Sequence, residues 1–250
     1  MSTGPEVVVR PDADDLARTV ATDLVDRLAA AQAEHGTASV VLTGGGIGTA
    51  VLHATAALAG EPGHPVDWTR VDIWWGDERW VPATDDERNE KGAREALLDV
   101  VGVPAERVHA FPSSDVGSAD GPDDAADAFL RDELLPAGGG SLPRFDVLML
   151  GVGGEGHVAS IFPDSPAVTD ERAVFAVHDC PKPPPTRLSF GYGAITSAEE
   201  VWLLVSGTAK AEAVARALSG QETSASLPAV GAVGRRATRW LLDRDAAARL

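Results

Sequence analysis

The stretch FDVLMLGVGGEGHVASIFP, residues 145–163, joins a very apolar run to a glycine-rich turn that carries one histidine, His157. The uninterrupted apolar run predicts a buried β-strand. Four of the six residues before His157 are glycines, and glycine lets the backbone turn sharply or approach another group closely. We expect residues 157–162 to begin a helix. A buried strand that leads through a glycine turn into a helix is typical of the parallel sheets of α/β proteins.

The same succession recurs along the chain. Apolar runs predict strands, and runs with helical periodicity that end at glycine predict helices. Strands are expected within residues 6–10, 38–46, 69–82, 107–111, 144–154, 172–179, 186–195, 199–207 and 238–243, and helices within 12–36, 48–60, 86–102, 125–135, 157–162 and 208–220. This order predicts a mainly parallel α/β sheet with helices on both faces. No internal repeat or linker is visible, so we expect a single domain spanning residues 1–250.

The composition of the 250 residues excludes several classes of protein. Apolar residues make up 44% and charged residues 24%, which is typical of a globular protein. A net charge of −17 argues against a nucleic-acid partner, although a few local cations would suffice for a small anionic substrate. The single cysteine, Cys180, excludes an internal disulfide and favours a reducing compartment. The sequence leaves a monomer and a small homo-oligomer both open.

The first sixty residues predict neither a signal peptide nor a membrane span. The first residues, MSTGPEVVVRPDADD, lack the basic start and apolar stretch of a signal peptide. Residues 38–60 carry no Asp, Glu, Lys or Arg, but four glycines interrupt this run. A strand, a turn and a helix explain the run better than a membrane span. We therefore expect a cytoplasmic protein with no membrane partner.

Three segments are expected to meet where parallel strands end, which is where ligands collect in such sheets. They are LTGGGIG (42–48), WWGDERW (74–80) and LGVGGEGH (150–157). The turn formed by Thr43, Gly44, Gly45 and Gly46 offers backbone N–H groups at a helix start, which suits a phosphate. It matches neither a Walker loop nor the dinucleotide fingerprint. The alternative is a glycine turn that serves only tight packing.

Two segments carry charged residues that could take part in a binding site. In WGDERW, Arg79 could bind a phosphate or a carbonyl oxygen, and Asp77 could orient a partner. The alternative is a solvated charged loop. In CPKPPPTR (180–187), the rigid proline stretch could fix the cations Lys182 and Arg187, or it could be only a stiff connector.

His157 is the candidate general base. At the start of a helix the dipole would disfavour the imidazolium and keep the ring neutral near pH 7. A neutral imidazole can take a proton from water, and a nearby carboxylate could hold its tautomer. A lone histidine is nevertheless more often a structural hydrogen-bonding group. The sequence has no Gly-x-Ser-x-Gly motif, and no His/Cys/Asp cluster has the spacing of metal ligands, so neither a serine hydrolase of that kind nor a metal site is expected.

The segments together resemble the 6-phosphogluconolactonases. GDERWVP followed by RNEKGAREALL is similar to that family's Gly-Asp-Glu-Arg loop and its asparagine-containing helix, which places Asn89 in the binding site. FDVLMLGVGGEGHVASIFP is similar to its histidine signature, which includes Gly156, and three later segments, KPPPTRLSF, VWLLVSGTAKAEAV and LPAV…TRWLLD, also match. The departures are TGGGIG in place of Ser-Gly-Gly-Ser-Thr-Pro, Glu155 in place of Asp, and Gly154 in place of Pro.

The resemblance implies hydrolysis of 6-phospho-D-glucono-1,5-lactone without a metal or cofactor, on a Rossmann-like fold similar to that of the glucosamine-6-phosphate deaminases. We expect His157 to activate water, Arg79, backbone N–H groups or both to stabilise the oxyanion, and Asp77 to fix the histidine or Arg79. The sequence leaves the roles of Arg79 and Lys182 interchangeable. Phosphate is assigned to the 43–46 turn with Lys182, Arg187 and Arg79. Two alternatives are a deaminase-like isomerase, whose histidine loop would continue into a glutamate absent from ASIFPDSP, and a non-catalytic sugar-phosphate sensor.

Overall fold

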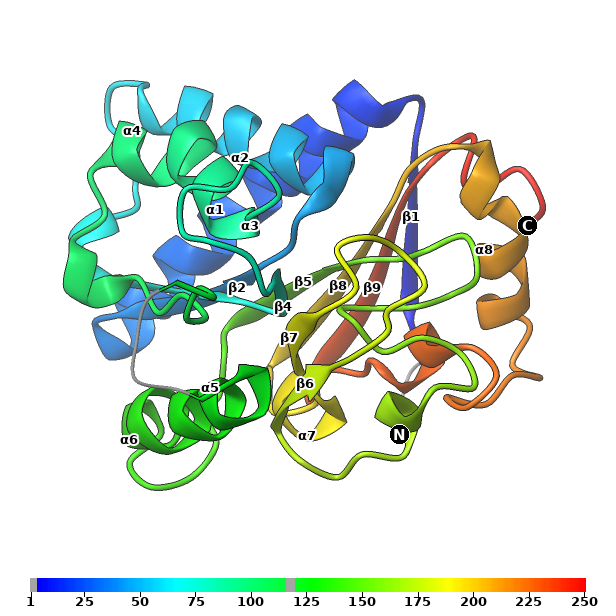
Figure 1. The fold of residues 1–250 in the computed structure, drawn as a ribbon. Coiled ribbons are helices and arrows are strands. Elements are labelled where there is room, and N and C mark those ends of the chain that lie inside the picture. The colour runs from blue at the N-terminus through cyan, green and yellow to red at the C-terminus, as the bar shows by residue number, and fades with distance from the viewer. Residues whose placement is uncertain (1–3, 116–119) are drawn as a thin grey trace.

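A computed structural model describes residues 4–115 and 120–250, and within these residues six strands form one parallel sheet (Figure 1). The strand order is β1 (Glu6–Arg10), β9 (Ala237–Asp243), β8 (Glu200–Val205), β5 (Val147–Gly151), β2 (Ala38–Leu42) and β3 (Val71–Trp75). Strand β8 is buried along its whole length, as expected for a strand covered on both faces. The predicted parallel α/β sheet is confirmed.

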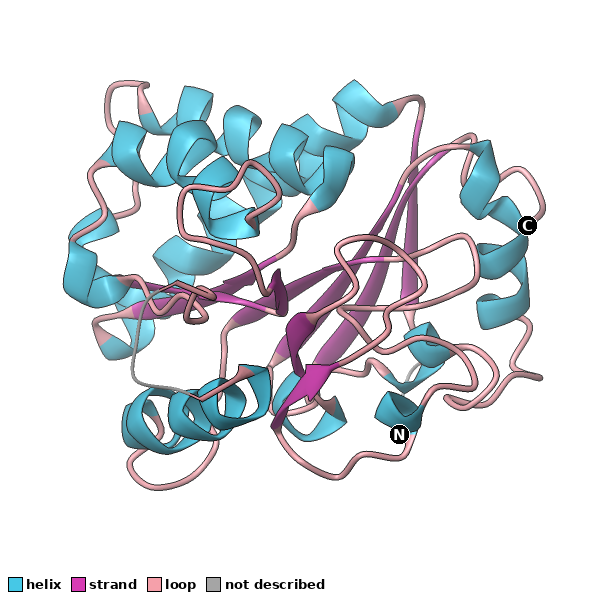
Figure 2. Ribbon diagram, in the orientation of Figure 1, coloured by secondary structure: helices cyan, strands magenta, loops and turns pink. Residues whose placement is uncertain are grey.

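Helices cover both sides of this sheet (Figures 1 and 2). On one side lie α1 (Ala13–His35), α2 (Gly45–Ala59), α3 (Asn89–Ala93) and α4 (Asp99–Val101); on the other lie α5 (Pro122–Phe129), α6 (Leu135–Ala137) and α7 (Tyr192–Ile195), while α8 (Ala211–Leu218) follows β8. π-helical turns at Arg94–Leu98 and Leu130–Leu134 join α3 to α4 and α5 to α6. Short 3₁₀ helices lie at Trp68–Arg70, Ala105–Arg107, Pro166–Val168, Thr208–Lys210 and Pro228–Gly231.

Helix α1 illustrates how local chemistry sets the element bounds. Asp12 caps its N-terminus by accepting a 2.8 Å hydrogen bond from the backbone N–H of Asp15. Leu16, Val20, Leu24 and Leu28 recur every four residues and are buried. The helix ends at Gly36, whose φ of +88° favours glycine.

A second, antiparallel sheet packs beside the first. It contains β4 (Asp77–Arg79), β7 (Arg187–Phe190) and β6 (Val174–Val177) in that order. The segment after Trp75 was expected to be a loop, but its backbone pairs with β7 and forms β4. The strand expected at residues 107–111 is wrong, because only Val108 bridges to Ile73 of β3.

The uncharged run 38–60 divides into β2, a turn and α2, as expected. In the described ranges, none of the helices combines the length and the apolar character that crossing a bilayer requires.

Candidate active site

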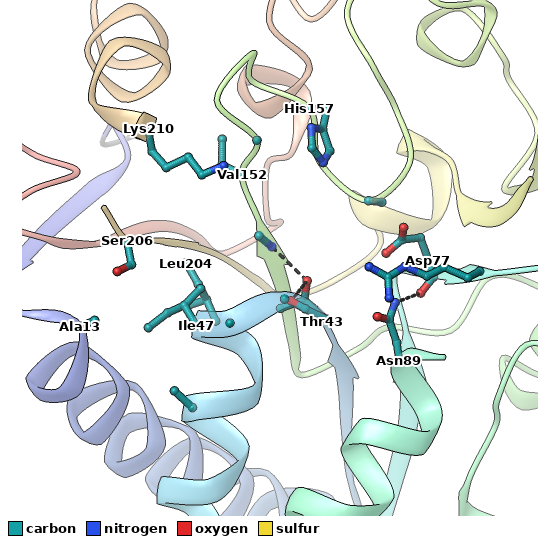
Figure 3. Close-up of a pocket in the computed structure, with 18 of the residues that line it drawn as sticks. Ala13, Thr43, Ile47, Asp77, Asn89, Val152, His157, Leu204, Ser206 and Lys210 are labelled. Carbon is teal, nitrogen blue, oxygen red and sulfur yellow. Dashed lines mark hydrogen bonds between the residues drawn. The ribbon is translucent and has the colours of Figure 1, made fainter. Parts of the chain in front are cut away.

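A cavity of about 460 Å³ opens at the carboxyl ends of β2, β5 and β8, beside β4 (Figure 3). Of the residues that the sequence assigned to a site, it is lined by Thr43, Gly44, Gly45, Gly46, Asp77, Arg79, Asn89, His157 and Arg187. Gly156 and Lys182 are not among the lining residues. The three strand-end segments therefore converge, as the parallel topology requires.

The glycine turn before α2 forms one wall of the cavity. Gly44 precedes the helix in an extended conformation, Gly45 has a φ of +82°, and no side chain caps the helix N-terminus. A Cβ on Gly44 would lie 2.0 Å from Asn89 Oδ1, so this close approach requires glycine. Thr43 Oγ1 accepts a 3.1 Å hydrogen bond from the Gly151 N–H and joins the ends of β2 and β5. The first amides of α2 are thus suited to binding an anion.

His157 lies in a tight loop, and the helix expected over residues 157–162 is wrong. Val158 and Ile161 form an antiparallel bridge, and Ala159 between them has a φ of +49° that an α-helix does not allow. The Ser160 N–H donates to Ser189 Oγ at 3.2 Å and not to a carbonyl four residues earlier. The bond to Ser189 of β7 and the bridge within the loop fix this segment, so no helical turn forms.

Burial keeps the His157 ring neutral, whereas the sequence had suggested a helix dipole as the cause. The ring stacks on Phe162 with centroids 4.3 Å apart, and only 16% of the side chain is exposed. Burial lowers the pKa of His157 to about 4, against the opposing charges of Glu155 and Asp77 and with a contribution from Lys182. The expectation of a neutral imidazole near pH 7 is met, but the physical cause differs from the predicted one.

Glu155 lies between His157 and Lys182. Its Oε1 is 3.2 Å from His157 Nδ1 and 2.7 Å from Lys182 Nζ. Burial raises the pKa of Glu155, but the hydrogen bond from Lys182 and nearby positive charge outweigh it and lower this pKa to about 2. The carboxylate next to His157 is therefore ionised at neutral pH, and the sequence pattern singled it out only as a departure from the family.

Neighbouring residues of the GDER segment, which contains β4, have different roles. Asp77 Oδ2 accepts a 2.6 Å hydrogen bond from the Ser160 hydroxyl and lies 3.6 Å from Arg187 Nη1. Glu78 is 1% exposed and accepts 2.8 Å hydrogen bonds from the backbone N–H groups of Arg79, Asn89 and Glu90. Glu78 thereby anchors the start of α3, whose Asn89 side chain donates to the Asp77 carbonyl at 2.9 Å.

The two predicted arginines, Arg187 and Arg79, differ in how many hydrogen bonds their guanidinium groups already donate to the protein. Arg187 is 6% exposed, and its guanidinium donates to the carbonyls of Lys182, Pro183 and Pro184 at 3.2–3.3 Å. It therefore anchors the proline segment while lining the cavity. Arg79 donates from Nη1 to the Glu87 carbonyl, whereas its buried Nε has no hydrogen-bond partner among the described residues.

Two polar side chains that line the cavity, Lys210 and Ser206, were not predicted from the sequence. Lys210 follows β8 at the end of the 3₁₀ helix Thr208–Lys210, and its side chain extends toward Val152 in the cavity (Figure 3). Burial and the charge of Lys182 lower the pKa of Lys210, and no carboxylate of the described ranges pairs with it. The signal was its place just after the carboxyl end of a buried strand. Ser206 donates to Asp243 Oδ2 at 2.5 Å, which leaves its oxygen to accept hydrogen bonds.

The cavity residues can bind a small anion and transfer a proton. The fold and the site are those of an α/β protein that binds its ligand at the carboxyl edge of a parallel sheet. Among the described residues there is no group of three or more His, Cys, Asp or Glu side chains that could hold a metal ion.

Comparison with known proteins identifies the family. Residues 11–240 match the family of glucosamine-6-phosphate isomerases/6-phosphogluconolactonase. The 6-phosphogluconolactonase of Streptomyces coelicolor is 48% identical over 256 residues, which cover 100% of this chain and 96% of that protein. The structure of 6-phosphogluconolactonase from Trypanosoma brucei matches with a TM-score of 0.84 and 26% identity over 100% of both chains. A monomeric glucosamine-6-phosphate deaminase matches with a TM-score of 0.80 over 98% of this chain and 100% of that chain, and at 19% identity shows the fold alone.

The chain therefore belongs to the glucosamine-6-phosphate isomerase/6-phosphogluconolactonase family. The resemblance predicted from its motifs is confirmed, and so is the predicted similarity to the deaminase fold.

Proposed function

We propose that the protein hydrolyses 6-phospho-D-glucono-1,5-lactone to 6-phosphogluconate, the second step of the oxidative pentose phosphate pathway. The relatives named 6-phosphogluconolactonase support this substrate. The observation that supports this reaction is a buried histidine, His157, with a pKa lowered to about 4. It lines a cavity that is also lined by cationic side chains.

His157 acts as the general base. Its Nδ1 lies 3.2 Å from the ionised Glu155 Oε1 but outside hydrogen-bond geometry, and the negative charge of the carboxylate favours the tautomer with the proton on Nδ1, which leaves Nε2 to accept one. Nε2 takes a proton from water as the water oxygen attacks the lactone carbonyl. When the tetrahedral intermediate opens, the bond between the carbonyl carbon and the ring oxygen breaks, and Nε2 returns the proton to that oxygen. This route uses no metal or cofactor.

The cavity provides separate positions for the two ends of the substrate. Lys210 and Ser206 lie toward one end, and Asp77 and Asn89 lie at the other (Figure 3). In the phosphorylated lactone the carbonyl carbon and the carbon that carries the phosphorylated side arm flank the ring oxygen, so the two groups leave the ring in different directions. Lys210 and the amides of the 44–46 turn bind the phosphate. Arg79, a cation that lines the cavity, stabilises the oxyanion, an effect worth about 10²–10³-fold for one donor.

The substitution His157→Ala tests the proposal. Loss of general-base help lowers the rate on freshly made lactone by about 10²–10⁴-fold and leaves product binding intact. The rate is measured by acid release after subtraction of spontaneous opening. The matched control is His53→Ala, an exposed histidine of α2, which keeps the wild-type rate. Retention of more than about a tenth of the wild-type rate by His157→Ala contradicts the general-base role.

A further inference from the structure

Three side chains form a continuous chain behind the candidate base. Lys182 Nζ lies 2.7 Å from Oε1 and 3.0 Å from Oε2 of Glu155, so it contacts both oxygens of the carboxylate. The same Oε1 lies 3.2 Å from His157 Nδ1. Phe162 lies beneath both ends, with its ring 4.3 Å from the imidazole centroid and 5.9 Å from Lys182 Nζ. Lys182 therefore contacts the residues that hold His157, and it does not line the cavity itself.

We propose that Lys182 is a positioning residue that acts through Glu155: it holds the carboxylate beside His157 and balances its charge, and it does not bind the phosphate of the substrate. The assignment rests on the proposed function, because it gives His157 the role of base. It reassigns a lysine for which the sequence suggested a phosphate contact.

Charge balance gives Lys182 its effect. The charged groups that face His157 are Glu155 from its own loop, Lys182 from the proline segment and Asp77 from β4. Further cations line the same cavity, namely Arg79, Arg187 and Lys210. With Lys182 in place, the Glu155 carboxylate is compensated and stabilises an imidazolium less strongly. Without Lys182 the carboxylate beside the ring is uncompensated, so it favours protonation of the ring more strongly, and it is held less firmly in place.

The rest of the segment is built to keep Lys182 where it is. Arg187 holds the carbonyls of Lys182, Pro183 and Pro184. The backbone N–H of Cys180 donates to the Pro185 carbonyl at 2.8 Å and closes the turn. The rigid segment thus presents its cation to Glu155 from outside the cavity.

Lys182→Met is the decisive variant, with Lys182→Arg as the charge-retaining control and Lys210→Met as the comparison for phosphate binding. In each, kcat and KM are measured on the phosphorylated lactone and on its unphosphorylated analogue between pH 3.5 and 8. The acidic limb of kcat/KM moves up by roughly half a pH unit in Lys182→Met, so its loss of activity is roughly twofold greater at pH 4 than at pH 7.5. The preference for the phosphorylated lactone is unchanged, and Lys182→Arg restores the wild-type limb.

A second measurement does not depend on activity. The His157 ring is titrated by NMR in the unliganded protein, with its signal assigned by comparison with His157→Ala. Its midpoint rises in Lys182→Met and returns in Lys182→Arg. If neither lactone is hydrolysed by the wild type, the proposed function fails, and this titration alone decides the role of Lys182.

Three results overturn the role of Lys182. The first is an unchanged His157 midpoint in Lys182→Met. The second is an acidic limb that does not move, with circular dichroism showing a folded protein. The third is a collapse of the preference for phosphorylated lactone in Lys182→Met to the level of Lys210→Met, which would assign the lysine to the phosphate.

Discussion

The Ser160 hydroxyl donates a 2.6 Å hydrogen bond to the Asp77 carboxylate, and both side chains are buried. This bond joins the loop that carries His157 to strand β4, which lies 83 residues earlier in the sequence. Asp77 was expected to fix the histidine or Arg79. Its hydrogen bond goes to the loop instead, so we expect Asp77 to hold the backbone that positions the histidine.

Ser160→Ala is therefore expected to destabilise the fold. A buried hydrogen bond to a charged group contributes about 1.5–3 kcal/mol, so the free energy of unfolding in urea should fall by about that amount. The control is Ser219→Ala, whose exposed hydroxyl donates to the Arg216 carbonyl at 2.7 Å, and it should cost less than about 0.5 kcal/mol. Equal costs for the two variants would show that the Asp77 contact does not stabilise the loop.

The architecture was largely predictable because it depends on patterns that are local in sequence. Apolar runs bounded by glycine predicted β2, β5 and β8, and a run with helical periodicity that ends at glycine predicted α1. Parallel strands end at one edge of a sheet, so the convergence of the glycine turn, the GDER segment and the histidine loop followed from topology.

The departures arise where non-local bonds outweigh local propensity. The residues after His157 were expected to begin a helix, but the Ser160 N–H donates to Ser189 Oγ and Ala159 adopts a positive φ. Strand β4 exists because its backbone pairs with β7, more than a hundred residues later. No spacing rule indicates that Lys182 reaches Glu155 while Lys210 reaches the cavity, since both positions depend on how distant loops pack.

Burial of His157 should make the fold less stable in acid. Its pKa in the folded protein, about 4, lies below the ordinary 6.5, so the unfolded chain takes up the proton first as the pH falls. Stability is therefore lost between pH 6.5 and pH 4, by about 3 kcal/mol at about 1.4 kcal/mol for each pKa unit.

The measurement is urea unfolding at pH 6.5 and at pH 4.5 for the wild type, His157→Gln and the exposed control His53→Gln. His157→Gln should lose about 2–3 kcal/mol less than the wild type over this interval, whereas His53→Gln should lose as much as the wild type. Equal losses of stability in all three proteins would mean that the pKa of the His157 ring is not lowered in the folded protein. The Glu155 carboxylate, with a pKa of about 2, loses its contribution only at lower pH.

Gly153→Ala should damage the site more than the fold. A Cβ at this position would lie 1.9 Å from His157 Nδ1 and 2.6 Å from Glu155 Oε2, so the imidazole and the carboxylate must both move. We expect kcat to fall by about tenfold or more, because a misplacement of about 1 Å can cost about 10²-fold. Gly92→Ala is the control: its Cβ meets nothing within 4 Å and it lies inside α3, so activity should be unchanged and stability equal or higher. Wild-type kcat in Gly153→Ala would show that the ring position is not critical.

Lys210→Met should remove the preference for a phosphorylated substrate. The ammonium group lies at the cavity, and no carboxylate of the described ranges forms an ion pair with it, in contrast to Lys91, which pairs with Asp86. Charge-assisted hydrogen bonds contribute about 1.5–3 kcal/mol, so kcat/KM on the phosphorylated lactone should fall by about 10–100-fold, mainly through KM. The value on the unphosphorylated analogue should stay within about twofold, since it lacks the group that Lys210 contacts. Equal losses on both lactones would place Lys210 at the carbonyl end of the substrate and return the phosphate to Arg79 and the glycine turn.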